Sequence, residues 1–208
     1  SVATLARPVA LCATLGTAVA HAQTDLVAWG LQKYDAGDLR DRFTQVAAGV
    51  EHSVALRLDG TVACWGHTGQ GRCTPPADLT QVVQLAAGSS HSMALRADRT
   101  IVCWGDNLYG QAKVPAGLSN ATQIAAGVYH SLSLTGDGIV AAWGSNSNGQ
   151  ATVPSALAGV TRICAGAYHS LALKSDTTVA AWGANSAGQC NVPATFNGAR
   201  EIAAGGSH

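Results

Sequence analysis

The chain has 208 residues with 12 basic and 12 acidic side chains, so its formal net charge is zero. A chain without excess positive charge lacks the field that holds a phosphate backbone, which disfavours nucleic-acid binding. The apolar fraction of 47% argues against a disordered chain. Beyond the N-terminus no apolar run reaches the length of a membrane-spanning helix, so we expect no membrane insertion of the mature protein.

The N-terminal segment is typical of a secretory signal peptide. An apolar stretch rich in small residues, 9–20, follows Arg7 and ends in Ala20-His21-Ala22, an A-x-A cleavage pattern. A buried helix is the alternative interpretation. We therefore expect residues 1–22 to be removed and residues 23–208 to form a secreted, periplasmic or cell-surface protein.

Five cysteines follow position 22, an odd number that cannot pair completely. Two of them, Cys64 and Cys73, flank one tight segment and could close a local disulfide in an oxidising compartment. No C-x-x-C spacing occurs, so we expect no zinc site, and nothing in the sequence indicates another metal or a cofactor. The five are Cys64, Cys73, Cys103, Cys164 and Cys190.

A repeat of 39 residues organises the rest of the chain, because five residue types recur at this step. The unit reads approximately V-x-x-I-A-A-G-x-x-H-S-L-A-L-x-x-D-G-T-V-x-A-W-G-x-N-x-x-G-Q-x-x-V-P. The first segment, 31–43, lacks these marks and gathers charged residues, so we interpret it as a degenerate solvated loop or short helical turn. The recurring positions are His52, His91, His130, His169 and His208; Gly49, Gly88, Gly127, Gly166 and Gly205; Trp65, Trp104, Trp143 and Trp182; Pro76, Pro115, Pro154 and Pro193; and Asp59, Asp98, Asp137 and Asp176.

The residue pattern within each unit predicts short strands. In the fourth we expect strands at 162–166, 169–174 and 178–183 with a turn at Asp176-Thr177, and either a ragged fourth strand or a connection at 189–193. Both strand faces are apolar, as in sheets covered on both sides, and the small Ala-Ala-Gly run suits a crowded centre. The fold class is therefore an all-β propeller with three- to four-stranded blades, and a straight solenoid is the rival. Four full units with partial units at both ends suggest a fragment of a larger ring.

The repeated A-A-G-x-x-H-S-L-A-L … W-G-x-N-x-x-G-Q-x-x-V-P motif, over residues 26–208, resembles the regulator of chromosome condensation repeat family in its short bacterial form. This resemblance implies a β-propeller, commonly seven-bladed. The short form is most similar to the secreted β-lactamase inhibitory propeller. Export and a neutral charge argue against the chromatin and nucleotide-exchange role of the eukaryotic members.

The recurring His-Ser pairs are not expected to be catalytic. Adjacent residues of a strand point to opposite sides of the sheet, so the two side chains of one pair cannot readily bond to each other. We expect these histidines to be structural, pairing with backbone near the turn, and the tryptophans to anchor blade packing. We therefore predict a non-enzymatic protein. The structural residues are His52, His91, His130, His169, Trp65, Trp104, Trp143 and Trp182.

The positions that do not repeat indicate the binding site. Antiparallel order places the G-x-x-H turns and the W-G-x-N-x-x-G loops on one face, and three of the four tyrosines fall there. Loops on a rigid scaffold are where binding residues concentrate, and exposed tyrosine is a favoured interface anchor. The alternative is that these tyrosines only cover the turns of their own blades. The predicted partner-binding residues are Tyr109, Tyr129, Tyr168, Asp106, Leu108 and His67.

The sequence therefore predicts an exported scaffold that binds a protein partner through one face. Two alternatives stay open: an inhibitor of an exported hydrolase such as β-lactamase, which the family resemblance suggests, and a carbohydrate-binding surface module, because loop asparagine and tyrosine also suit sugars. An enzyme would need a catalytic cluster outside this stretch of sequence.

Overall fold

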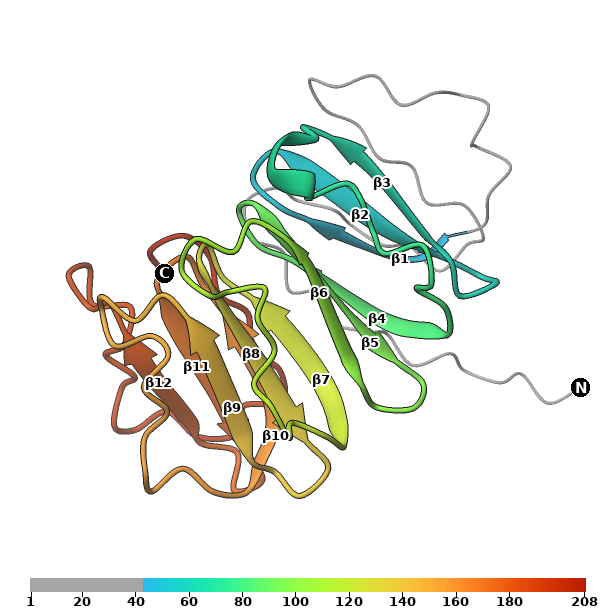
Figure 1. The fold of residues 1–208 in the computed structure, drawn as a ribbon. Helices are drawn as coiled ribbons and strands as arrows, with labels where there is room; N and C mark the ends of the chain where they lie inside the picture. The colour runs from blue at the N-terminus through green and yellow to red at the C-terminus, as the bar shows by residue number, and fades with distance from the viewer. Residues whose placement is uncertain (1–42) are drawn as a thin grey trace, which may run out of the picture.

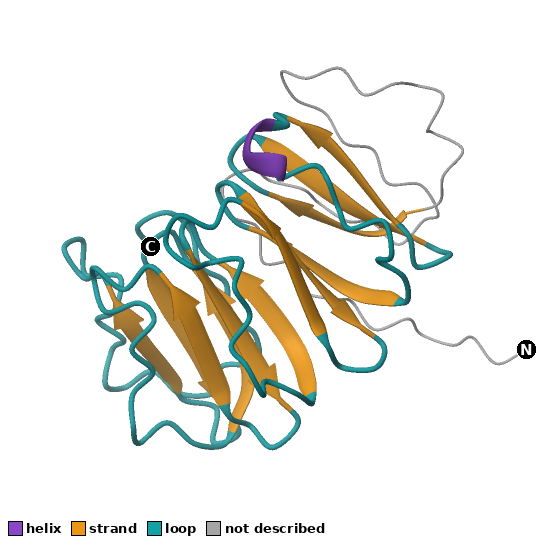
Figure 2. Cartoon of the chain, in the orientation of Figure 1, coloured by secondary structure: helices purple, strands orange, loops and turns teal. Residues whose placement is uncertain are grey.

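The structure, a computed structural model, describes residues 43–208, so the expected signal peptide and most of the degenerate segment lie outside the described residues. The described chain forms four antiparallel sheets of three strands each, which follow one another in chain order (Figure 1). Besides strands it contains one short 3-10 turn, η2 (Gly69–Gly71), and extended loops (Figure 2).

Each sheet is one blade, built in the strand order inner, middle, outer. Blade 1 is β1 (Phe43–Ala48), β2 (His52–Arg57) and β3 (Val62–Gly66); blade 2 is β4 (Val82–Ala87), β5 (His91–Arg96) and β6 (Ile101–Gly105); blade 3 is β7 (Ala121–Ala126), β8 (His130–Thr135) and β9 (Val140–Gly144); blade 4 is β10 (Val160–Ala165), β11 (His169–Lys174) and β12 (Val179–Gly183).

The strands expected in the fourth unit are confirmed with small shifts. The middle strand begins and ends as predicted, and the outer strand begins one residue later. The inner strand is Val160–Ala165 rather than 162–166, and a bulge between Val160 and Arg162 interrupts its regular pairing with the middle strand. Residues 189–193 form a connection and not a fourth strand, so the described blades are three-stranded.

The inner strands β1, β4, β7 and β10 lie next to one another, each in contact with the following one. This arrangement fits blades that meet at their inner strands. The glycine that follows each inner strand is needed for the close approach: a Cβ on Gly88 would lie 2.3 Å from the carbonyl oxygen of Gly127 and 2.3 Å from the His91 ring. The Ala-Ala-Gly run therefore does occupy the crowded centre.

The hydrophobic core is divided into three clusters, each between two successive blades. The cluster between blades 1 and 2, for example, joins Val54 and Leu56 to Leu85 and Trp104. The other two repeat this pattern between blades 2 and 3 and between blades 3 and 4. Both faces of an internal blade are thus covered, which explains why its strands are apolar on both sides.

A repeated hydrogen-bond relay closes each junction between described blades. His91 Nε2 lies 3.0 Å from the Ser131 hydroxyl of the next blade, and that hydroxyl donates to the Gln111 carbonyl at 2.8 Å. Trp143 Nε1 donates to the same carbonyl at 2.9 Å. The relays at the other two junctions join His52, Ser92, Arg72 and Trp104, and His130, Ser170, Gln150 and Trp182.

The relay corrects one expectation. The histidines are structural, but His52, His91 and His130 pair with a serine of the following blade and not with backbone near their own turn. The reason is that the serine side chain, on the opposite side of its own blade, points at the neighbouring blade. Because the serine hydroxyl donates to a carbonyl, the imidazole must donate from Nε2. Burial lowers the pKa of His91 to about 3, so the ring is neutral.

Candidate functional site

The G-x-x-H turns and the W-G-x-N-x-x-G loops emerge at the same end of every blade, as expected. Within each blade the first loop residue donates its N–H to the carbonyl of a turn residue, for example Asp106 to Ser90 at 2.8 Å and Ser145 to Tyr129 at 2.8 Å. We call this end the loop face. The end formed by the hairpin turns at 58–60, 97–99, 136–138 and 175–177 is the hairpin face.

The loop face brings the three predicted tyrosines together. The ring centroids of Tyr109 and Tyr129 lie 5.0 Å apart, and those of Tyr129 and Tyr168 lie 6.3 Å apart. The three rings come from blades 2, 3 and 4, so they form an arc across successive blades and do not merely cover their own turns. Tyr109 is 50% exposed and Tyr168 is 40% exposed, and Leu108 beside them is 78% exposed. We call the rings of Tyr109, Tyr129 and Tyr168 the tyrosine arc.

The loop that carries Leu108 and Tyr109 is locked from within. Asp106 accepts the N–H of Leu108 with one carboxylate oxygen and the Gln111 amide with the other. Gln111, which is fully buried, accepts the N–H of Tyr109 at 2.9 Å. Asp106 therefore shapes the loop, because both of its oxygens already have partners. The Gln111 carbonyl also belongs to the junction relay, so the same residue connects this loop to blade 3.

The loop asparagines also form hydrogen bonds within their own loops. Asn146 Oδ1 accepts the N–H of Ala151, and its amide donates to Thr152 at 2.9 Å. Asn185 likewise accepts from Cys190 and donates to Asn191. These amides use one N–H and the oxygen to close their loops, so only part of their hydrogen-bonding capacity is left for a sugar.

Blade 1 departs from the other blades on this face. Arg72 stands where the other units have glutamine, and its side chain is only 4% exposed. Its guanidinium lies 3.0 Å from Glu51 and also donates to Gln70 and to the carbonyl of Gly69. Sequence reasoning missed this cluster, although the interruption of the G-Q motif at Gly71-Arg72 was a visible signal.

His67 and the local disulfide also lie in the blade 1 loop. His67 is exposed, and its Nδ1 accepts the N–H of Gly69 at 3.1 Å. Cys64 and Cys73 form a disulfide, a pairing that the sequence left open, and it ties the outer strand to the loop end. The other loops use their asparagine for this closure, and blade 1 has Thr68 at that position. His67 belongs to the blade 1 loop, whereas the tyrosine arc comes from blades 2, 3 and 4.

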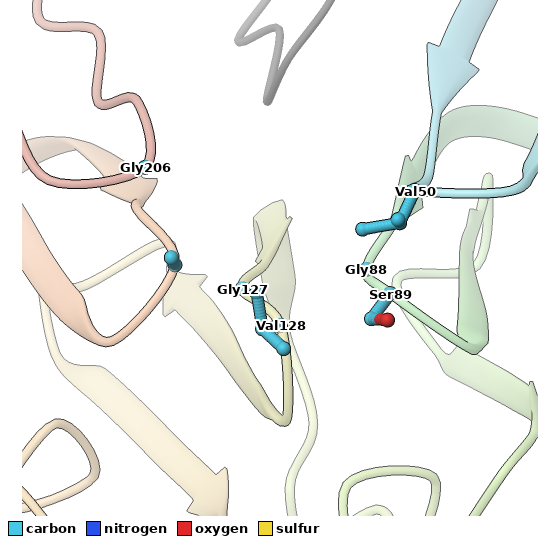
Figure 3. A pocket seen from close by; sticks show the side chains of 7 residues that line it. Val50, Gly88, Ser89, Gly127, Val128 and Gly206 are labelled. Carbon is cyan, nitrogen blue, oxygen red and sulfur yellow. The ribbon is translucent and has the colours of Figure 1, made fainter.

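The centre of the loop face has a shallow hollow lined by small side chains from successive turns, among them Val50, Ser89, Val128 and Ala167 (Figure 3). Its volume is about 10 Å³, and a second hollow between the inner strands has about 60 Å³. Ligand pockets for drug-sized molecules measure roughly 300–1,000 Å³. Neither hollow therefore suits a drug-sized ligand.

The His-Ser contacts between blades have the surroundings of structural hydrogen bonds and not of catalytic pairs. The spacing between His91 Nε2 and the Ser131 hydroxyl would suit a base and a nucleophile. Both side chains, however, are fully buried, and the hydroxyl proton is directed at a carbonyl. Among residues 43–208 no group of three His, Cys, Asp or Glu side chains is arranged to hold a metal ion, and no helix is long and apolar enough to cross a membrane.

Fold and site together define a β-propeller repeat protein with a structured loop face. The sequence profile of the regulator of chromosome condensation (RCC1) repeat matches residues 43–72, 82–111, 121–150 and 160–189. The chain belongs to the RCC1 repeat family. Propellers of this family generally serve as protein-interaction scaffolds. A search of curated proteins found no match.

Similar solved structures share the fold. Prp20p of Saccharomyces cerevisiae is 19% identical with a TM-score of 0.68, over 86% of this chain and 56% of that one. The receptor kinase CR4 ectodomain of Physcomitrella patens is 27% identical with a TM-score of 0.68, over 82% and 46%. Human WBSCR16 is 21% identical with a TM-score of 0.64, over 85% and 57%. The chain therefore spans about half the length of these structures.

Proposed function

We propose that this protein is an exported, non-enzymatic propeller that binds a protein partner through its loop face. The observation that carries the proposal is the tyrosine arc: three partly exposed rings from three blades in one continuous contact. Tyrosine supplies a large contact area at little cost in side-chain entropy, and such residues dominate the energy of many interfaces.

The rigidity of the site supports the same conclusion. Asp106 and Gln111 hold Leu108 and Tyr109 in place, and the junction relay connects that loop to the blade that carries Tyr129. A surface that is ordered before binding loses less conformational entropy when the partner arrives. The turns add to this order, since Ser89 donates to Val128 and Val128 to Ala167 across blade boundaries.

A protein partner fits this face better than a sugar or a nucleic acid. The loop amides that a sugar would use already spend part of their hydrogen-bonding capacity within their loops. The net charge of zero offers no attraction to a phosphate backbone. One similar structure, the yeast Prp20p, is described by its binding to Gsp1p and histones, which are themselves proteins. Inhibition of an exported hydrolase such as β-lactamase is the narrower form of this proposal, in which that enzyme is the bound partner.

Export is supported by three observations of different kinds. The A-x-A pattern precedes Gln23, Cys64 and Cys73 form a disulfide, and a relative with 27% identity is the ectodomain of a receptor kinase. Mass spectrometry of the exported protein, expressed with its leader, should find a mature N-terminus at Gln23. An intact leader in a protein retained in the cytoplasm would contradict this part of the proposal.

The test of the binding site is site-specific photocrosslinking. A photoreactive amino acid at Leu108 should crosslink to a discrete protein of the exported fraction, and the same group at Leu58 on the hairpin face should not. Replacing Tyr109, Tyr129 and Tyr168 by serine should abolish the Leu108 adduct, because the arc supplies most of the apolar contact. A purified β-lactamase with nitrocefin as substrate tests the inhibitor role directly. An adduct that survives the triple substitution would refute the proposed site.

A further inference from the structure

We infer that the partner presents an uncharged apolar patch edged by a lysine or arginine, and that Glu51 receives this basic side chain. The inference rests on the proposed function and specifies the chemistry of the partner. It follows from the distribution of charge over the loop face, which differs between blade 1 and blades 3 and 4.

The sector of the loop face formed by blades 3 and 4 has no charged residue. Its turns and loops are residues 128–129, 145–149, 167–168 and 184–188, and all of them are apolar or neutral polar. The hairpin face, in contrast, has an aspartate in every turn. A charge brought against the neutral sector would be buried without a partner, which is costly. The part of the partner that covers Tyr129 and Tyr168 must therefore be uncharged.

The charges of the loop face lie at its blade 1 and blade 2 edge, and they are of both signs. Lys113, at the end of the blade 2 loop, is exposed. In blade 1, Arg72 is only 4% exposed, whereas the Glu51 side chain beside it is 59% exposed. Arg72 contacts one carboxylate oxygen of Glu51, and the other has no hydrogen bond to a described residue. Asp106 directs both of its carboxylate oxygens into its own loop. Glu51 is therefore the acceptor that this face offers to a partner.

Glu51 is close enough to the arc for one partner to cover both. Val50, which precedes Glu51, lines the same hollow as Val128 and Ala167, which precede Tyr129 and Tyr168. The turns of successive blades therefore line one hollow at the centre of the face (Figure 3). A basic side chain at the rim of an otherwise apolar contact would gain from Glu51, and an acidic one would be repelled.

Selection from a phage-displayed library of short random peptides tests this inference without a known partner. The purified protein is the target, and a Tyr109→Ser/Tyr168→Ser variant is used to remove peptides that bind elsewhere. The tyrosine-dependent peptides should combine aliphatic or aromatic residues with a lysine or arginine. Peptides that are tyrosine-dependent but acidic, or that lack a basic residue, would overturn the inference and leave the proposed function standing.

The second measurement uses Glu51→Gln, which keeps an oxygen acceptor for Arg72. The affinity of the selected basic peptides should fall about tenfold, and its dependence on salt should weaken, because a rim charge acts mainly through long-range attraction. Asp176→Asn on the hairpin face is the matched control and should change neither. Urea unfolding of both variants shows that the fold is kept. Unchanged affinity in Glu51→Gln overturns the inference; failure to select any tyrosine-dependent peptide counts against the proposed function as well.

Discussion

At the scale of single residues, the repeat allows equivalent positions of the four blades to be compared with one another. In blades 1, 3 and 4 a threonine near the start of the inner strand donates to a carbonyl of the middle strand: Thr44 to Leu56, Thr122 to Leu134 and Thr161 to Leu173, at 3.3, 3.1 and 3.2 Å. Blade 2 has Val83 at this position, 54% exposed. The carbonyl of Leu95 therefore lacks the bond that its counterparts receive from a threonine.

We predict that Val83→Thr stabilises the protein by about 0.5–1 kcal/mol, because the new hydroxyl adds a hydrogen bond and removes an exposed apolar side chain. The free energy of unfolding in urea measures the effect. Val83→Ala is the control, since it removes the apolar group without supplying a donor. Equal stability of the threonine and alanine variants would show that the bond contributes nothing at this position.

At the scale of one loop, blade 1 has a cysteine at both positions of its disulfide, and blade 2 has a cysteine at only one of the two equivalent positions. Cys64 and Cys73 of blade 1 form the disulfide. Cys103 occupies the position of Cys64 one unit later, and its counterpart at the position of Cys73 is Ala112. Burial raises the pKa of the Cys103 thiol to about 12, so this cysteine is an unreactive thiol in the folded protein.

Ala112→Cys should therefore pair with Cys103 and stabilise the protein by about 2–3 kcal/mol, because a short loop is closed in the unfolded state. The bond should be formed during oxidative refolding, since the buried thiol is protected once folded. Thiol titration and urea unfolding with and without reductant detect it. Ala112→Ser is the control. An extra free thiol after refolding would mean that the geometry of blade 1 is not repeated in blade 2.

At the scale of the whole molecule, the blade junctions depend on neutral histidines. Burial lowers the pKa of His52 and His130 to about 4 and of His91 to about 3. The unfolded chain takes up these protons near pH 6.5, and the folded chain does so only near pH 4 or below. Protons therefore bind preferentially to the unfolded state in this window, and acid must weaken the stack of blades.

We predict full histidine-dependent stability above pH 6.5, a loss as the pH falls towards 4, and a levelling below the folded pKa values. Each histidine contributes a slope of about 1.4 kcal/mol per pH unit within the window. Urea unfolding at a series of pH values measures the slope. His91→Gln should reduce the slope, because one of the buried histidines is then removed. A flat profile across the window would show that the junction histidines are already charged in the folded protein.

The 39-residue repeat is enough to predict the blade and its orientation. Because position classes recur at one step, the strands of each blade, the turn at Asp176 and the common face of Tyr109, Tyr129 and Tyr168 follow from the order of residues alone. The start of the inner strand does not, since a bulge before Arg162 interrupts its regular pairing with the middle strand. The relay partner of His91 does not either, because Ser131 belongs to a different blade and no pattern within one unit points to it.

The way in which neighbouring units meet is a property of the folded chain. The 5.0 Å separation of Tyr109 and Tyr129 and the relay between blades both depend on the rotation from one blade to the next, which no spacing within a unit encodes. The burial of Arg72 beside an exposed Glu51 also depends on how a loop folds against a turn distant in sequence. Local periodicity thus specifies the blade, and packing between blades creates the surface.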